Sequence, residues 1–239
     1  VRQAADMVAA GELGDIRVVQ VEYPQDWLTE RLEATGQKQA SWRTDPAQAG
    51  AGGSIGDIGT HAYHLACTVL GETAATLLAD LSTFVDGRPL DDNAHVLLRW
   101  GSGAKGMLWA SQVAPGNENA LRLRVYGSKG GLEWAQEQPN HLFVTPFGEP
   151  TRLITRAGAG AGDSASRVSR IPAGHPEGYL EGFGNLYSEI AAAIQARKSG
   201  TMVPPEIRFP TVEDGRAGVA FIEAVVRSSR DGGAWTALG

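Results

Sequence analysis

The stretch NAHVLLRWGSGAKGMLWASQV, residues 93–113, decides the fold. Two runs of alternating apolar and polar residues flank the short turn GSG, which is the pattern of two strands joined by a tight turn. Similar runs occupy most of the chain from Leu77 to Thr155, separated by the turn-forming segments DGRP, APGNEN and GSKG. Seven strands in succession, joined by turns this short, predict a large and mostly antiparallel sheet.

The region before this sheet predicts a strand, a loop and a helix. Ile16, Val18, Val21 and Tyr23 alternate with polar residues, which indicates a strand with one buried face that Pro24 ends. Residues 28–55 are polar and rich in Gly and Ala, so we expect a long loop. A helix is predicted over residues 56–70, followed by Gly71.

Two long helices are predicted at the end of the chain, over residues 176–200 and 211–233. The first has Pro176 in its first turn, and the second opens with a capping box from Thr211 to Asp214. The sheet is the surface on which we expect their apolar stripes to pack. The stripes comprise Leu180, Phe183, Leu186, Tyr187, Ile190 and Ile194 in the first helix, and Val219, Ile222, Val225 and Val226 in the second.

Together these elements predict the α+β class: a two-layer domain with a large, mostly antiparallel sheet covered by helices on one face. The other face would be solvated or would pack against a second copy of the chain. Trp100 and Trp109 lie on the strands and favour a dimer interface on that open face. We therefore expect a homodimer or homotetramer assembled through the open sheet face.

Composition narrows the function classes. The chain has 239 residues, of which 42% are hydrophobic, and a formal net charge of −6 with no basic stripe. These values indicate a globular protein and argue against nucleic acid or an anionic membrane as a partner. The single cysteine, Cys67, favours a reducing compartment, and no apolar run approaches 18 residues, so we expect a cytoplasmic protein.

The stretch GGSIGDIGTHAYHLA, residues 52–66, is the candidate for chemistry. On a regular helix, Asp57, His61 and His64 share a face that is separate from the apolar face. One interpretation is structural: Ser54 and Asp57 cap a helix, and His61 stays neutral near the helix start. The other is an acid–base site in which Asp57 orients the imidazole of His61. A metal site is a weaker alternative because nothing nearby suggests a fourth ligand, so no metal is predicted.

The glycines of residues 50–56 do not form a nucleotide-binding loop. The pattern GxGxxG would need glycine at position 55, where Ile55 stands, and no strand with a following acidic residue frames the segment. His175, directly before the first long C-terminal helix, is either a surface histidine or a group presented into a cleft.

The segments WRTDPAQAGAGGSIGDIGTHAYHLACTVLG, LDDNAHVLLRWGSGAKGMLWASQV, RVYGSKGGLEW and GHPEGYLEGFGNLY resemble the glucose–fructose oxidoreductase/inositol dehydrogenase/rhizopine catabolism family, called Gfo/Idh/MocA. The resemblance extends over essentially the whole chain. It implies that residues 1–14 are the end of a crossover helix from a missing N-terminal Rossmann domain. Residues 15–239 would then be the C-terminal substrate-binding and oligomerisation domain.

The family's site residues can be carried over by position. The resemblance implies that His61 is the general base that takes the hydroxyl proton, and that Asp57 orients the substrate and the imidazole. Trp42 and Arg43 match the WR pair that faces the cofactor and substrate.

Three further residues complete the implied substrate site, to which Arg43 also belongs. Gln25 lies where the long strand reaches the cleft, and His175 matches a histidine that lines the pocket in similar members. His64 stands where many members carry Asp, so the substrate subset can differ.

The implied function is the C-terminal part of an NAD(P)-dependent dehydrogenase that oxidises a secondary alcohol of a sugar, an anhydrosugar such as levoglucosan, or a cyclitol. NAD or NADP would be bound mainly by the missing Rossmann domain, so we expect the 239 residues alone to be inactive. The alternatives are a non-catalytic sugar-binding and dimerisation module, and an NAD-dependent glycosidase of the same family.

Overall fold

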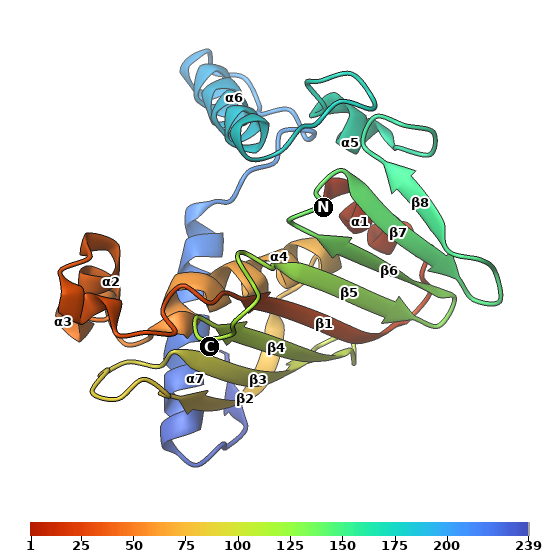
Figure 1. Cartoon of the computed structure of the whole chain (residues 1–239). Helices are drawn as coiled ribbons and strands as arrows, with labels where there is room; N and C mark the ends of the chain where they lie inside the picture. Colours follow the sequence, from red (N-terminus) through yellow and green to blue (C-terminus); the bar gives the residue numbers. More distant parts are fainter. Residues whose placement is uncertain (239) are drawn as a thin grey trace.

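A nine-stranded sheet forms the centre of the structure, a computed structural model that describes residues 1–238. The strands lie in the order β8-β7-β6-β5-β1-β4-β3-β2-β9 (Figure 1). The pair β1 and β4 is parallel, and the other neighbouring pairs are antiparallel, as predicted. The strands are β1 (Ile16–Pro24), β2 (Ala74–Ser82), β3 (Asn93–Trp100), β4 (Lys105–Ser111), β5 (Arg122–Gly127), β6 (Gly130–Ala135), β7 (His141–Pro146), β8 (Arg152–Thr155) and β9 (Thr236–Ala237).

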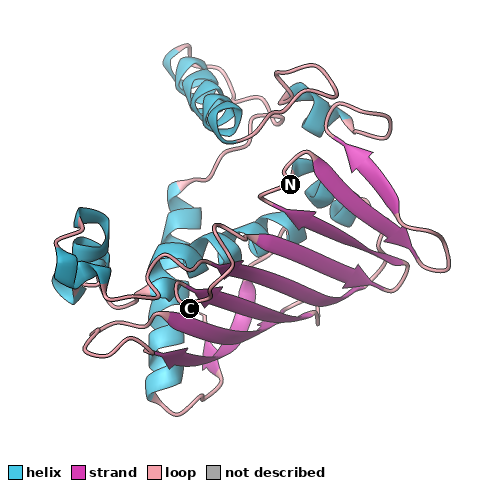
Figure 2. Ribbon diagram, in the orientation of Figure 1, coloured by secondary structure: helices cyan, strands magenta, loops and turns pink. Residues whose placement is uncertain are grey.

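Helices cover one face of this sheet and leave the other open, which confirms the two-layer α+β prediction (Figure 2). No helix of residues 1–238 combines the length and the apolar character needed to cross a bilayer. The helices are α1 (Arg2–Ala9), α2 (Lys38–Arg43), α3 (Pro46–Ala49), α4 (Thr60–Leu70), α5 (Asp163–Arg167), α6 (Tyr179–Lys198) and α7 (Val212–Arg230), with a 3₁₀ turn η1 (Leu32–Thr35) and a π-helical turn η2 (Ile55–Gly59).

The two faces of the sheet follow from the alternation of side chains along each strand. Trp100 is buried on the helix-covered face, whereas Trp109 lies on the open face, where its ring is stacked with that of His95. The sequence prediction for β1 was wrong at one position. Val18 points to the open face and is 38% exposed, while its neighbour Val19 is fully buried in the core.

Helix α7 packs on the sheet as predicted, and Val225 of the predicted stripe is fully buried, but the buried stripe is shifted towards Phe221. Phe221 is fully buried and stacks on Tyr63 of α4 with ring centroids 4.0 Å apart, whereas the predicted stripe residue Val219 is 57% exposed. The predicted capping box is present, since the Thr211 N–H donates to the Asp214 carboxylate at 2.6 Å.

Helix α6 does not pack on the sheet, so that prediction was wrong. It lies beyond the β8 side of the sheet (Figure 1), and much of its apolar stripe is exposed, including Leu180 at 78% and Tyr187 at 68%. The helix also begins at Tyr179, after the predicted start at Pro176.

The region that was predicted as a long loop, residues 28–55, contains the short elements η1, α2 and α3. Gln37 and Asp45 start the two helices by accepting hydrogen bonds from the Ala40 and Ala47 N–H groups. These elements place Trp42 and Arg43 beside the segment that holds Asp57, because a hydrogen bond joins Arg43 to Asp57.

Candidate active site

The candidate site lies where the parallel strands β1 and β4 end. The Gln25 N–H donates to the Ser111 carbonyl at 2.7 Å, which carries the β1–β4 pairing one step past the strands. The Gln112 N–H donates to the Asp92 carbonyl at 2.9 Å, just before β3. Three chain segments therefore meet at the same end of the central strands β1, β4 and β3, and each brings a polar side chain there.

The glycine segment joins this edge through a π-helical turn. The Thr60 N–H bonds the Ile55 carbonyl, five residues back, and η2 continues directly into α4. Such turns occur mostly singly and often at functional sites. The predicted capping arrangement is wrong, since the Ser54 hydroxyl donates to Asp91 at 2.7 Å and caps no helix. Asp57 is therefore free to use its carboxylate elsewhere.

Asp57 accepts two hydrogen bonds through the same oxygen. Arg43 Nε lies 3.0 Å from Asp57 Oδ2, and Gln112 Nε2 lies 2.7 Å from it. The Asp57 and Arg43 side chains are 24% and 25% exposed, so the pair borders solvent. Within residues 1–238 no hydrogen bond joins Asp57 to His61, and the donors to the Asp57 carboxylate come from other segments.

Aromatic and amide groups surround the Arg43 guanidinium. Its carbon lies 4.2 Å from the ring centroid of Trp42 and 5.8 Å from that of Trp27. Trp27 Nε1 donates to Gln25 Oε1 at 3.0 Å, and Gln25 Nε2 donates to Asn119 Oδ1 at 2.8 Å. Gln25, Trp42 and Arg43 are therefore joined to Asp57 in one continuous set of contacts.

His61 closes this set on the α4 side. It is exposed, and its ring lies edge-on to Tyr23 with centroids 6.3 Å apart. Tyr23 in turn donates its hydroxyl to Asn119 Oδ1 at 2.6 Å. Burial raises the pKa of Tyr23, its hydrogen bonds with Gln136 and Asn119 oppose that rise, and the charge of Asp57 adds to it. Tyr23 therefore remains a proton donor at neutral pH.

His64 faces away from this set. Its Nε2 lies 3.9 Å from Asp214 Oδ1 in the first turn of α7 and 3.5 Å from Thr68 Oγ1. In the part of the chain that the structure describes, no group of three or more His, Cys, Asp or Glu residues could hold a metal ion. The structure thus gives His64 a contact with α7 and no contact with Asp57.

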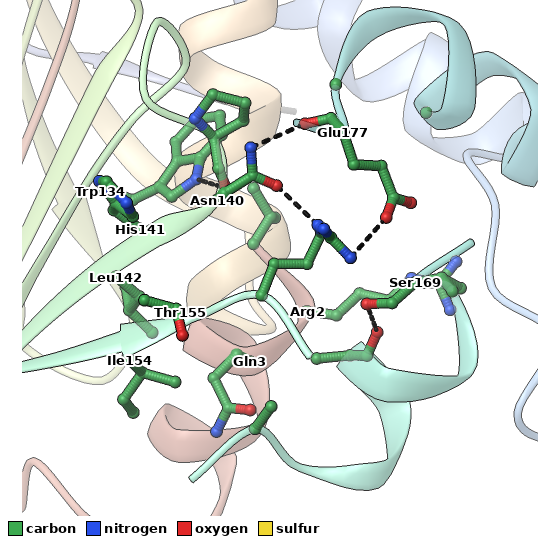
Figure 3. Close-up of a pocket in the computed structure, with 18 of the residues that line it drawn as sticks. Arg2, Gln3, Trp134, Asn140, His141, Leu142, Ile154, Thr155, Ser169 and Glu177 are labelled. Atoms are coloured by element: carbon green, nitrogen blue, oxygen red, sulfur yellow. Dashed lines mark hydrogen bonds and ion pairs between the residues drawn. The ribbon is translucent and has the colours of Figure 1, made fainter. Parts of the chain in front are cut away.

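His175 lies in a separate region around Arg156. Arg156 donates to the carbonyl of His175 at 2.8 Å, pairs with Glu177 at 2.7 Å and donates to Asn140 at 2.7 Å. Figure 3 shows Asn140 and Glu177 beside a cavity of about 280 Å³ between α1, β7 and the segment before α6. Neither this cavity nor the hollow at His175 is lined by Asp57 or His61.

Comparison with known proteins identifies the family. The profile described as the GFO/IDH/MocA C-terminal domain matches residues 1–133. The chain belongs to the GFO/IDH/MocA family. An uncharacterised oxidoreductase of Bacillus subtilis is 35% identical over 98% of this chain and 60% of its own length.

Solved structures of other proteins share the fold. A crystal structure of an oxidoreductase from Sinorhizobium meliloti has 55% identity and a TM-score of 0.85, over 98% of this chain and 60% of that one. An inositol dehydrogenase homologue from Azotobacter vinelandii, complexed with NADH and myo-inositol, has 35% identity and a TM-score of 0.89, over 99% and 60%. The chain therefore spans about three fifths of the length of the relatives it matches.

Four members of the contact set in this GFO/IDH/MocA chain were missed by the sequence analysis: Tyr23, Trp27, Gln112 and Asn119. Tyr23 was correctly assigned to the buried face of a strand, but a buried position gave no reason to expect that its hydroxyl would bond Asn119. Gln112 directly follows a predicted strand, and a polar residue at a strand end was a usable signal. Asn119 lies in a turn-forming segment, where asparagine is expected for conformational reasons and carries no functional signal.

Proposed function

We propose that this chain is the substrate-binding, C-terminal part of an NAD(P)-dependent dehydrogenase that oxidises a secondary alcohol of a sugar or cyclitol. The observation that carries the proposal is the Asp57 carboxylate held between Arg43 and Gln112, one helical turn before the exposed His61. Membership of the GFO/IDH/MocA family supports it, as does the coverage of about three fifths of longer oxidoreductase relatives. Residues 1–14 would follow an N-terminal nucleotide-binding domain.

The proposed roles follow from the chemistry of each side chain. The unoccupied Oδ1 of Asp57 would accept a hydrogen bond from a substrate hydroxyl, while its Oδ2 stays on Arg43 and Gln112. His61, exposed on the same side as Tyr23, would take the proton of the reacting hydroxyl as general base. Gln25 would help fix the substrate ring, since its amide already lies in the contact set.

The nicotinamide, when bound, would accept the hydride that leaves the same carbon whose hydroxyl loses its proton. The residues of this chain could contact the nicotinamide ring from one side only. The Arg43 guanidinium lies against the Trp42 ring, and Trp42 is 37% exposed. The exposed part of the ring would offer a flat aromatic surface beside the site. The GxGxxG match at residues 101–106 joins the antiparallel strands β3 and β4 and opens no helix, so the phosphates would be bound elsewhere.

We also propose that two copies assemble through the open sheet face. This face exposes apolar side chains from five strands, where a lone sheet would normally carry polar ones. They are Val18, Leu97, Met107, Tyr126 and Phe143, each between 38% and 48% exposed. Light scattering tests the assembly, and a strictly monomeric protein at micromolar concentration would contradict it.

The activity is tested by kinetics on the longer protein that contains this chain, with NAD⁺, NADP⁺ and a panel of cyclitols, sugars and anhydrosugars. His61→Asn should lower kcat about 10²- to 10⁴-fold, as expected for loss of a general base. Asp57→Asn should lower kcat/KM by a similar factor, because one oxygen becomes an amide beside Arg43. His141→Asn, at the first residue of β7, is the control and should keep kcat within twofold.

The same assay on the 239 residues alone should show no reduction of NAD⁺ or NADP⁺ with any polyol. Activity of the isolated chain would contradict the proposed division of labour between two domains. Full activity of His61→Asn would contradict the proposed base.

A further inference from the structure

Asp91 is a buried carboxylate outside the contact set of the candidate site. It precedes β3, is 8% exposed, and binds the glycine segment with both oxygens. Oδ1 accepts the Gly53 N–H at 2.6 Å, and Oδ2 accepts the Ser54 hydroxyl at 2.7 Å and the Ile55 N–H at 2.9 Å. Three hydrogen-bond donors from residues 53–55 thus bind one buried carboxylate, which fixes this segment relative to Asp91.

The backbone of Asp91 adds to this attachment. Its carbonyl accepts the Ser54 N–H at 2.8 Å. A side chain at Gly53 would place its Cβ 2.0 Å from that carbonyl oxygen, so only glycine permits the approach. Burial raises the pKa of Asp91, while the bonds from Ser54, Ile55 and Gly53 oppose the rise.

The attached segment leads directly to Asp57. The Asp57 N–H donates to the Gly53 carbonyl at 2.9 Å, so the start of the π turn is fixed to the residue that Asp91 holds. The next residue, Asp92, accepts the backbone N–H of Gln112, whose side chain reaches Asp57. Asp92 acts on Gln112 only through its backbone carbonyl, which Asp92→Asn keeps, whereas Asp91 holds the glycine segment with its carboxylate.

We propose that Asp91 is a positioning residue that sets the orientation of Asp57 towards Arg43, Gln112 and the substrate. Its kinetic consequence rests on the proposed function, whereas its structural consequence does not. Small displacements of a group that orients substrate lower the rate steeply. Asp91→Asn replaces one of the two acceptor oxygens by a donor NH2 group, so one or two of the three bonds are lost. Compared with the same change at a matched buried carboxylate, it should lower turnover much more for a similar loss of melting temperature.

Asp92 is that matched control. It is fully buried, and its carboxylate binds the Phe84 and Val85 N–H groups at 2.9 and 3.0 Å and Arg88 at 3.1 Å. These contacts serve the turn before β3 and do not reach the glycine segment. Asp92→Asn changes the same atoms in the same dipeptide, so it reports the general cost of altering a buried carboxylate here.

The test compares Asp91→Asn, Asp92→Asn and Ser54→Ala in the longer protein. Asp91→Asn should lower kcat about 10- to 100-fold, with KM changed less than threefold. Ser54→Ala removes one of the three bonds and should lower kcat about two- to fivefold. Asp92→Asn should lower the melting temperature comparably to Asp91→Asn but change kcat less than threefold. Hydrogen exchange of residues 53–59 should accelerate in Asp91→Asn and stay unchanged in Asp92→Asn.

Two results overturn the inference: normal exchange of residues 53–59 in a folded Asp91→Asn protein, or equal losses of kcat in the two aspartate variants. If the unmodified protein oxidises no polyol, the proposed function fails. Hydrogen exchange, together with the ¹³C carboxyl shift of Asp57, then decides the role of Asp91 by itself. An unchanged Asp57 shift in Asp91→Asn would count against it.

Discussion

The two long helices α6 and α7 have similar lengths, and each carries a stripe of apolar residues, but they are held in different ways. α7 buries Phe221, Ala224 and Val225 against α4 and the sheet. α6 leaves Tyr179 and Leu180 each almost four-fifths exposed. The comparison teaches that the 3.6-residue period identifies a helix and its apolar stripe, whereas the partner surface decides whether the stripe is covered.

Polar contacts take the place of apolar packing for α6. The buried Glu189 carboxylate accepts hydrogen bonds from Arg2 at 2.9 Å, from the Arg208 N–H at 2.6 Å and from Arg167. Burial would raise the pKa of Glu189, but the bonds from Arg2, Arg208 and Arg167 outweigh it and lower the pKa below the usual 4.5. Arg170 adds hydrogen bonds to Asn185 and Ser188 of the same helix. α6 is thus attached by polar and charged contacts, and α7 by a core.

Phe221→Ala tests the core packing of α7 and should give the largest loss of stability. The ring is fully buried and stacks on Tyr63, so its removal leaves a cavity between α7 and α4. The free energy of unfolding should fall by about 3 to 5 kcal/mol. Urea unfolding followed by circular dichroism measures the change.

The effect should also reach the candidate site, because Tyr63 lies on α4 between His61 and His64. Val219→Ala, on the exposed side of α7, is the control and should lose less than about 0.5 kcal/mol. A loss below about 1 kcal/mol for Phe221→Ala would show that α7 is not held by its core contacts.

Glu189→Gln should act on α6 with a smaller effect. The neutral amide removes the charge that Arg2 and Arg167 share, at a cost of about 1 to 3 kcal/mol. Because the folded-state pKa lies below 4.5, the carboxylate contributes fully at neutral pH, and its contribution disappears as the pH falls through the lowered value.

Hydrogen exchange at pH 7 measures this effect helix by helix. Residues 179–198 should exchange faster in Glu189→Gln, whereas residues 212–230 should not change. Equal acceleration in both helices would mean that α6 and α7 unfold as one unit.

Much of the fold could be predicted from the sequence because local signals agreed with the tertiary environment. The alternation along β3 and β4 and the Thr211 to Asp214 capping box are local patterns, and the structure contains both. The failures are positions that local pattern cannot decide. Val18 and Val19 are equally apolar neighbours, and only the register of β1 against β4 decides which one is buried.

The candidate site was predicted in part. Asp57 and Arg43 were singled out, and the structure brings them together. The partners Gln112 and Asn119 come from strand ends and turns far away in sequence, so no spacing rule links them to Asp57. The π turn could not be predicted either, because the contacts at its start come from Asp91, which is far away in sequence.

Leu180→Ser should give the smallest effect and sharpen the comparison most directly. The side chain is 78% exposed on the stripe of α6, so the substitution removes little buried apolar surface. The free energy of unfolding of the 239-residue chain should change by less than about 0.5 kcal/mol. Val225→Ser, at a fully buried stripe position of α7, is the matched variant and should be strongly destabilising, because it buries a hydroxyl in the core. Urea unfolding of the two variants side by side measures the contrast. Similar losses in both would mean that the α6 stripe is covered in solution, and the distinction between a helix held by charge and one held by a core would then fail.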